Sequence, residues 1–550
     1  MTFLAEDLTV VIPTRQRWDI LACTLEALSR QRTGGFSTLV VVDGDDDPPP
    51  LPEWANVLAV PRGGPGAARN AGAQVANGSL VLFLGDDMVP SPDLVTLHLA
   101  AHNLHDEDEV AVLGHARWHR DVERGRVQRW MDRSSTQFDY PTVECDDAGF
   151  GRFYSCNVSL KKRFFLENGG FDDDFRYYYE DLDCGWRLAQ KGMRLVYEPA
   201  AITNHLHRYD LSALERRFHG VAAGEHLMAS RHAWFEPFFL ARVRAAVADG
   251  APRRLWPLVV DHVPTAMRSL RSRAELRTDT WYLNRLAPAF LAGWAAAEEL
   301  AELRAYLGDS FDPSLLAGHQ QAVDAERAAA GDEEAFYRTS RAYLYDLTVF
   351  AMSGTKAPYH AEIRSVTNPG ARLLDYGCGI GADGLRLASD GYDVAFCDYD
   401  NPSTAFLRWR LGRRGLQSPV YLLGSGEVPA GFDLAYSFDV IEHVDDPMAF
   451  LGELETRASM VAVNLLEEDP ADTDLHKPLP IGAILDHAAS AGIVRYRRYH
   501  GRSHLVIYRS PGAPHARRQR RTRWRSRLER RFGPHLRGLR PWYPVPASGC

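Results

Sequence analysis

Short apolar runs that end directly in proline, aspartate or glycine recur along this chain and limit the folds that it can adopt. In the first half, these runs are residues 8–12, 38–42 and 79–84. Residues 18–31, between the first two runs, have the apolar spacing of an amphipathic helix. Strands that alternate with helices are typical of a mostly parallel sheet, which binds ligands at the carboxyl ends of its strands. We therefore expect a site where acidic residues follow the runs.

Similar strand-like runs return in the second half of the 550-residue chain, and the first two of them end directly in glycine or aspartate. The runs there are residues 372–376, 393–397, 432–437, 459–464 and 503–508. Between the two halves, residues 210–345 are rich in Ala, Leu, Arg and Glu, which predicts helices. We expect prolines such as Pro288 to break these helices into pieces. The fold class that follows is α/β, with two doubly wound α/β domains joined by a helical segment.

We predict four parts from these boundaries: an α/β domain over 1–235, a helical extension and linker over 236–330, a second α/β domain over 331–510, and a basic tail over 511–550. Residues 517–540 hold eleven arginines and a single acid, Glu529. A solvated, disordered tail is the favoured interpretation, and weak association with an anionic membrane surface is the alternative. A net charge of -9 argues against specific nucleic-acid binding by the whole chain.

Targeting and cysteine patterns point to the cytoplasm. No signal peptide is recognisable, and no stretch reaches the roughly 18 apolar residues of a membrane span. The seven cysteines have no paired spacing, so the sequence suggests neither a disulfide framework nor a cysteine-based zinc site. We expect a cytoplasmic protein with reduced thiols, whose basic tail could contact the inner face of the membrane.

Four polar segments follow one another in the first half. They are Asp43-Gly44-Asp45-Asp46-Asp47, Gly63 to Gly72 with Arg69, Asp86-Asp87, and Glu180-Asp181 after a Gly169-Gly170-Phe171-Asp172 turn. Carboxylates do not bind a diphosphate directly, but they can hold Mg²⁺ or Mn²⁺, which then bridges to it. A separate carboxylate can accept the proton of an attacking hydroxyl. The set suits group transfer from a nucleotide-diphosphate donor.

From about residue 8 to 232, this order resembles the GT-A fold glycosyltransferases of family 2. The resemblance implies a nucleotide-sugar donor, Mn²⁺ or Mg²⁺, and inversion of the anomeric centre by direct displacement. For the donor, it implies Asp43 at the nucleobase, Asp45 or Asp46 at the ribose, Arg69 and Asp86 near the nucleotide, and Asn157 near the donor–acceptor junction. It implies Asp87 and His205 as metal ligands. It implies Asp181 as the general base, with Glu180 as the alternative. Gly85 departs from the pattern, because many members have Asp there.

The acceptor is not readable from these segments. Residues 115–150 hold several aromatic side chains, including Trp118, Trp130 and Tyr140. Such rings could stack on a sugar or belong to the core, and the sequence favours neither.

A glycine-rich turn follows the first strand of the second half. It reads Asp375-Tyr-Gly377-Cys-Gly379-Ile-Gly381 and opens a helix, where glycines let the backbone approach a ligand closely. A dinucleotide-binding turn is the alternative, since Gly379, Gly381 and Gly384 fit that spacing as well. Asp398 ends the next strand, where an acid could bind a ribose. Asp439-Val-Ile-Glu442-His443 follows the third strand.

Over about 335–508, these features resemble the class I S-adenosylmethionine-dependent methyltransferases. The resemblance implies that Asp375, Gly377, Gly379 and Gly381 line the cofactor site, that Asp398 binds the ribose hydroxyls, and that Asp439 lies beside the cofactor. His443 and His476 are candidate bases for a hydroxyl acceptor.

We therefore predict a bifunctional enzyme in polysaccharide or secondary-metabolite biosynthesis. One half transfers a sugar from a nucleotide-sugar donor to a glycan or small-molecule acceptor, and the other methylates the sugar or the acceptor. The alternatives are a glycosyltransferase with a structural or S-adenosylmethionine-sensing second half, and a non-catalytic scaffold that binds glycans.

Overall fold

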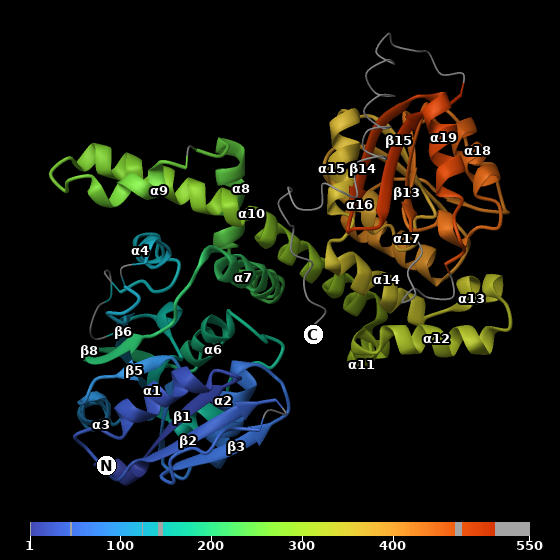
Figure 1. The fold of residues 1–550 in the computed structure, drawn as a ribbon. Helices are drawn as coiled ribbons and strands as arrows, with labels where there is room; N and C mark the ends of the chain where they lie inside the picture. The colour runs from blue at the N-terminus through green and yellow to red at the C-terminus, as the bar shows by residue number, and fades with distance from the viewer. Residues whose placement is uncertain are drawn as a thin grey trace. The chain divides into compact units, whose positions relative to one another are not determined.

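The computed structural model divides the chain into two compact units, residues 1–297 and residues from 298 onward. It describes residues 2–44, 47–123, 125–140, 143, 147–252, 254–467 and 476–511. Asp45, Asp46 and almost all of the predicted tail, residues 512–550, lie outside this description. Figure 1 shows the elements of both units.

The first unit is built on an eight-stranded mixed sheet of order β3-β2-β1-β4-β7-β6-β8-β5. Its strands are β1 (Leu8–Thr14), β2 (Ser37–Asp43), β3 (Ala55–Val60), β4 (Leu80–Leu84), β5 (Met88–Pro90), β6 (Val110–Trp118), β7 (Asn157–Lys161) and β8 (Arg194–His205). Strands β1 to β4 pair in parallel, whereas β7 is antiparallel to both β4 and β6. The expected mostly parallel sheet therefore holds for one half of this sheet.

Helices cover both faces of this sheet because its central strands are apolar on both sides. Val11 and Val41 face the cluster that includes Ala68 and Ala73 of α2, whereas Val10 faces the cluster that contains the apolar side of α1. Alternate residues of a strand point to opposite faces, so both faces need a covering layer. The helices of the first unit are α1 (Trp18–Leu28), α2 (Pro65–Val75), α3 (Leu94–Leu104), α4 (Arg126–Arg133), α5 (Lys162–Glu167), α6 (Glu180–Ala189), α7 (Leu211–Arg231), α8 (Phe238–Asp249) and α9 (Trp256–Val259).

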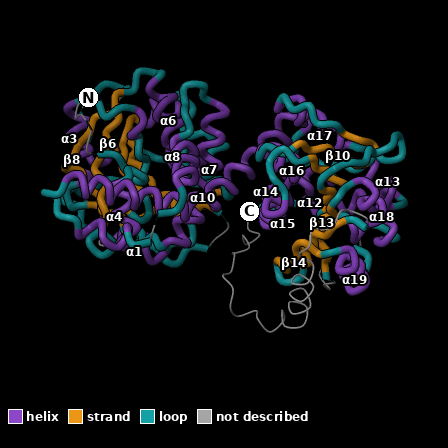
Figure 2. Tube along the Cα trace, turned by 90° about the horizontal axis from the view of Figure 1, so that it is seen from above, coloured by secondary structure: helices purple, strands orange, loops and turns teal. Residues whose placement is uncertain are grey.

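A long helix, α10 (Arg268–Leu307), begins in the first unit and ends in the second. Its first part lies beside α7 and α8 (Figure 2). Phe218, Val243 and Phe290 belong to the apolar cluster that these helices share. Gly293 allows close contact, since a Cβ there would lie 2.1 Å from the carbonyl oxygen of His219. The expectation that Pro288 ends a helix is wrong, because Pro288 lies inside α10.

The second unit contains a seven-stranded sheet of order β11-β10-β9-β12-β13-β15-β14. Its strands are β9 (Arg372–Tyr376), β10 (Asp393–Asp398), β11 (Val420–Leu422), β12 (Leu434–Ser437), β13 (Met460–Leu466), β14 (Ile493–Tyr499) and β15 (Ser503–Arg509). Strand β15 runs antiparallel to both of its neighbours, and β9 to β13 pair in parallel. Because β15 is antiparallel, this sheet differs from the all-parallel sheet that is typical of dinucleotide-binding folds.

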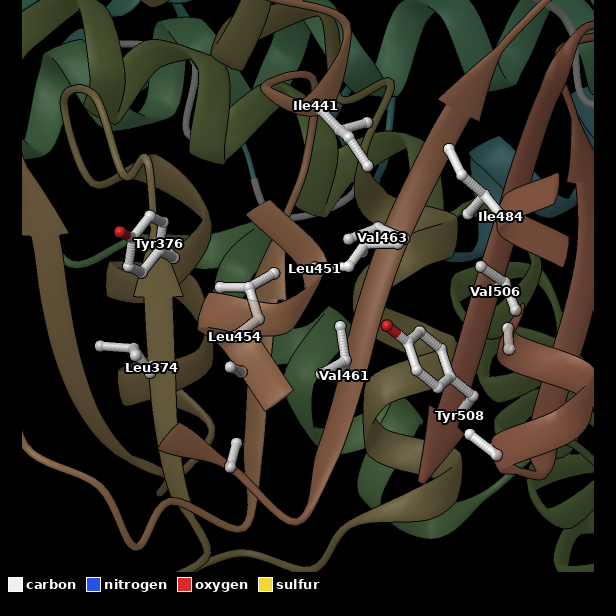
Figure 3. Close-up of a cluster of buried hydrophobic side chains, with 14 of the residues drawn as sticks. Leu374, Tyr376, Ile441, Leu451, Leu454, Val461, Val463, Ile484, Val506 and Tyr508 are labelled. Atoms are coloured by element: carbon white, nitrogen blue, oxygen red, sulfur yellow. The ribbon is translucent and has the colours of Figure 1, made fainter. Parts of the chain in front are cut away.

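The two faces of this second sheet are also covered. Leu374, Val461 and Val506 pack against Leu451 of α18 and Ile484 of α19 (Figure 3). The opposite face packs against α15, α16 and α17. The helices are α11 (Pro313–Ala317), α12 (His319–Ala330), α13 (Glu333–Thr339), α14 (Ala342–Ser353), α15 (Ala357–Val366), α16 (Ala382–Ser389), α17 (Pro402–Arg414), α18 (Pro447–Arg457) and α19 (Ile481–Ala491). No helix within the described ranges is both long and apolar enough to cross a membrane.

Candidate active sites

Asp86 and Asp87 follow β4 and are held by one arginine. Arg17 donates from Nη1 to Asp87 Oδ2 over 2.7 Å and also bonds both carboxylate oxygens of Asp86. Burial and the charge of Asp87 raise the pKa of Asp86 to about 6. Burial also acts to raise the pKa of Asp87, but His205 and Arg17 outweigh burial and lower this pKa well below its usual range. Asp87 is therefore a carboxylate at neutral pH.

Two histidines from the end of β8 meet Asp87. His205 Nε2 lies 3.3 Å from Asp87 Oδ2, and His207 Nδ1 lies 3.6 Å from the same oxygen. The ring of His205 stacks on Trp118 at 4.9 Å, which fixes its plane. One carboxylate oxygen and two imidazole nitrogens form a donor set that Mn²⁺ accepts. Asp87 and His205, the two predicted ligands, therefore lie together and could share a divalent cation. His207 adds a nearby nitrogen that also lies 3.3 Å from Arg17 Nη1.

Gly85 stands where an aspartate was expected because there is little space for a side chain. A Cβ at this position would lie 2.8 Å from Met88 Cγ and 3.2 Å from Asp87 Oδ1. A larger residue would have to displace both side chains.

Glu180 and Asp181 begin α6 directly after two residues with left-handed backbone. Tyr178 and Tyr179 have φ of 63° and 68°, a conformation that non-glycine residues adopt at a cost and that often marks functional sites. The Ser155 amide donates to Asp181 Oδ2 over 3.0 Å. Burial, together with their mutual repulsion in the case of Glu180, raises the pKa of both carboxyls. Because their pKa values are raised, these carboxyls are suited to accept a proton near neutral pH.

Arg69 of α2 faces this acidic pair. Its Nη1 lies 3.8 Å from Glu180 Oε1, and its guanidinium lies over the ring of Phe171. Within the described part of the chain, Arg69 Nε and Nη1, Glu180 Oε2 and Asp181 Oδ1 are buried without a hydrogen-bond partner. Buried polar atoms without partners are costly unless a ligand satisfies them. This group is the part of the first unit best suited to bind a polar substrate.

Two predicted donor-binding residues are already engaged. Asp43 accepts hydrogen bonds from the amides of Gly63 and Gly64, so it holds the loop that leads into α2. Asn157 is fully buried and donates to the Ala201 carbonyl, while His98 contacts its Oδ1 at 3.0 Å. Their contact with a donor stays a prediction.

The aromatic side chains at 115–150 pack on other aromatic rings of the first unit. Tyr140 stacks with Tyr197 and contacts His115, and Trp130 is 1% exposed and stacks on Tyr282. Trp118 is the ring of this set that stacks on His205.

In the second unit, the glycine-rich turn after β9 has the backbone that only glycine adopts easily. Gly377, Gly379 and Gly381 have φ of 76°, 52° and 73°. A Cβ on Gly381 would lie 2.4 Å from Leu407 Cδ1, and one on Gly377 would lie 2.7 Å from Val440 Cγ2. This turn, the glycine cradle, therefore packs closely against Leu407 and Val440, and its contact with a cofactor stays a prediction.

Acidic residues surround this cradle. Asp398, at the end of β10, accepts from the Gly379 amide over 2.7 Å, and burial raises its pKa. Asp375 is buried and accepts from the Gly384 amide over 3.1 Å. Asp375 and Asp398 thus lie beside the turn, and their contact with a cofactor stays a prediction.

A lysine that the sequence analysis missed connects the next acids. Lys356 Nζ lies 3.1 Å from Asp383 and 3.3 Å from Asp439, and His360 Nε2 lies 2.7 Å from Asp383. Asp439, with φ of 56°, also receives a hydrogen bond from Asn464. Lys356 precedes α15, far from the other motifs in sequence, and no local pattern marks it.

Comparison with known proteins gives each unit a family. Residues 9–163 match "Glycosyl transferase family 2", and residues 353–537 match the family described as "Methyltransferase domain". The chain therefore carries a family 2 glycosyltransferase domain followed by a methyltransferase domain. Along the chain, the helical segment α7 to α10 separates the two mixed sheets.

Individual relatives each match part of the chain. The pre-mycofactocin glycosyltransferase of Mycobacterium tuberculosis is 27% identical over 54% of this chain and 63% of its own length, so the chain spans less than two thirds of that relative. The validoxylamine A glucosyltransferase of Streptomyces hygroscopicus subsp. jinggangensis is 28% identical over 34% of this chain and 53% of its own length. A solved mannosyltransferase from Pyrobaculum calidifontis, in complex with GDP-Man and Mn²⁺, is 18% identical over 52% of this chain and 87% of its own, with a TM-score of 0.34.

Proposed function

We propose that this chain is a bifunctional enzyme. The first unit transfers a sugar from a nucleotide-sugar donor to an acceptor hydroxyl with inversion, and the second methylates that sugar or the acceptor with S-adenosylmethionine. The observation that carries the proposal is the buried group of Arg69, Glu180 and Asp181, whose polar atoms lack partners within the described residues.

Asp87, His205 and His207 would hold a Mn²⁺ or Mg²⁺ ion in the first unit. When bound, such an ion neutralises negative charge on the departing diphosphate. Arg17 adds a positive charge at the same carboxylates, since it bonds both Asp86 and Asp87. With the ion bound, its two charges and that of Arg17 would exceed the charges of Asp86 and Asp87, which favours a diphosphate group.

The acidic pair would handle the proton. The acceptor oxygen forms a bond to the anomeric carbon, the bond from that carbon to the diphosphate oxygen breaks, and the hydroxyl proton moves to Asp181, with Glu180 as the alternative. The Ser155 amide holds Asp181 Oδ2, which leaves Oδ1 to accept the proton. Proton transfer to a positioned base contributes about 10²- to 10⁴-fold to such reactions.

In the second unit, S-adenosylmethionine would supply the methyl group as an electrophile. The turn of Gly377, Gly379 and Gly381 would let the cofactor lie against the backbone, and Asp398 would accept from its ribose hydroxyls. Lys356 holds Asp439 in place at the edge of the cradle. The names of two relatives, which refer to pre-mycofactocin and validoxylamine A, support a secondary-metabolite acceptor.

The test begins with a panel of nucleotide sugars, screened by thermal shift with and without Mn²⁺, because a ligand that binds the native state raises the unfolding temperature. With the donor that stabilises the chain most, we expect Asp181→Asn to lower donor hydrolysis by about 10²- to 10⁴-fold. Asp19→Asn, an exposed residue of α1, is the matched control. Hydrolysis that survives in both Asp181→Asn and Glu180→Gln would contradict the proposal.

A further inference from the structure

Three potential metal ligands converge after β12. Glu442 and His443 lie in a short 3₁₀ turn, Ile441–His443, and His476 follows later in the chain. One ligand atom from each lies within 4.8 Å of the other two. Glu442 is 1% exposed, whereas the two histidines are partly exposed. The group is therefore anchored on a buried carboxylate and open toward the histidines.

Backbone and side-chain contacts hold these residues together. The Lys477 amide donates to the Glu442 carbonyl over 2.7 Å, which ties the two segments beside each other. Lys477 Nζ bonds the His443 carbonyl and Asp445, so its charge is matched outside the three ligands. Tyr337 OH lies 3.3 Å from His443 Nδ1. A partner of this kind on one ring nitrogen orients a histidine whose other nitrogen binds a metal.

We propose that Glu442, His443 and His476 bind a divalent metal ion. Two imidazole nitrogens and one carboxylate oxygen suit Zn²⁺, Fe²⁺, Co²⁺ or Mn²⁺ better than Ca²⁺, which prefers oxygen donors. Donor atoms around such an ion, each about 2.1 Å from it, are separated by about 3 Å when adjacent, so small side-chain rotations would close the group. Three protein ligands leave coordination positions for a substrate.

The neighbourhood of the group indicates what would take those positions. Asp439, three residues before Glu442, lies at the edge of the glycine cradle and contacts Lys356. The metal would therefore lie on the acceptor side of the cofactor site, an assignment that rests on the proposed methyltransferase function. A sugar-like acceptor with neighbouring hydroxyls could bind the metal through its oxygens, and the metal would lower the pKa of the reacting hydroxyl.

Methyl transfer then balances without a histidine base. The acceptor oxygen forms a bond to the methyl carbon, the carbon–sulfur bond breaks with its electron pair kept on sulfur, and the hydroxyl proton passes to water. His443 and His476, which the sequence offered as bases, act as metal ligands in this arrangement. Glu442, which the sequence analysis did not select, becomes the third ligand.

Metal binding by the full chain without a histidine tag tests this inference directly. After treatment with EDTA, the protein is dialysed against Zn²⁺, and bound zinc per chain is counted by mass spectrometry. The parent carries His205→Ala, which disables the proposed site in the first unit. In that parent, we expect Glu442→Gln and the double variant His443→Ala/His476→Ala to bind Zn²⁺ more than about 100-fold more weakly, since loss of an outer-shell partner alone costs 10- to 100-fold.

His500→Ala is the control, because His500 is an exposed histidine of the same unit. Thermal unfolding in EDTA checks that each variant is folded, and Glu442→Gln keeps the shape of the side chain. Zinc binding that is equal in the parent and in folded Glu442→Gln would overturn the inference. Titration of the parent with S-adenosylmethionine distinguishes the metal site from the proposed methyltransferase function. Failure to bind the cofactor would contradict the methyltransferase function. Zinc binding that Glu442→Gln leaves unchanged would contradict the metal site.

Discussion

In the first site, one arginine, Arg69, offsets the charges of Glu180 and Asp181. The pH dependence of the site can therefore be traced to these three residues. Burial and the charge of Asp181 raise the pKa of Glu180 to about 7, and Arg69 works in the opposite direction. Arg69 also lowers the pKa of Asp181 against the effect of burial. The two carboxyls titrate as a pair, so kinetics will report values that belong to both.

We expect the rate of donor hydrolysis to fall with decreasing pH, because a base acts only when it is ionised. If Asp181 is the base, burial places this acidic limb above the usual range of an aspartate, and if Glu180 is the base, the limb lies at about pH 7. Arg69→Met removes the cation that lowers these pKa values, so the acidic limb should move to higher pH. The measurement is kcat/KM against pH for the wild type, Arg69→Met and the exposed control Arg163→Met. An acidic limb that stays in place, or moves to lower pH, in Arg69→Met would contradict this account.

Residues that follow strands were predictable, and residues held by long-range contacts were not. Asp86, Asp87, Asp375 and Asp398 were found because acids at strand ends lie at one edge of a sheet. Arg17 and Lys356 gave no local signal, since each meets its acids only after folding. Gly85 looked like a missing ligand in sequence, but the space around its Cα explains it as packing.

At the scale of elements, strands with strong apolar runs were predicted well. The runs at 8–12, 38–42, 372–376 and 503–508 all became strands of similar bounds. Strand β14 was missed because Arg495, Arg497 and Arg498 interrupt its apolar pattern. The order of the strands, including the reversal of β15, depends on pairing between distant segments and could not be deduced from local spacing.

The last part of α10 is joined to the second unit by buried ions. Arg410 of α17 is fully buried and bonds Glu299 and Glu302, and Arg414 adds two bonds to Glu302. A buried ion pair adds little stability over apolar packing, but the loss of one partner leaves uncompensated charge. These bonds therefore favour the observed packing of the last part of α10, because any other packing would leave the buried charges unpaired.

We expect Arg410→Met to destabilise the second unit by about 3–5 kcal/mol, because Glu299 would lose its hydrogen-bonded arginine and Glu302 would keep only Arg414. Combining it with Glu299→Gln and Glu302→Gln should restore part of the loss. Chemical denaturation of the full chain, followed by a probe in the second unit, measures the change, with the exposed Arg408→Met as control. A loss below about 1 kcal/mol for Arg410→Met would show that these bonds carry little weight.

At the scale of the molecule, two sheets each have a covered core and a candidate site of their own. The first site is made of residues from 17 to 207, and the second of residues from 356 to 464. Each set lies within one unit, so the account predicts that the two activities can be removed separately. The division into four parts that the sequence suggested, with its boundaries at 235, 330 and 510, stays a prediction.

The most direct test measures both activities in the same full-length variants. Gly381→Ala places a Cβ 2.4 Å from Leu407 Cδ1, whereas Gly415→Ala has a similar positive φ but nothing within 4 Å of its Cβ. Calorimetric titration with S-adenosylmethionine and assays of donor hydrolysis are run on both, and on Asp181→Asn. We predict that Gly381→Ala loses cofactor binding but keeps hydrolysis, that Asp181→Asn does the reverse, and that Gly415→Ala keeps both. A wild-type chain that binds no S-adenosylmethionine, or a Gly381→Ala variant that binds it as well as Gly415→Ala does, would contradict the account of two active sites.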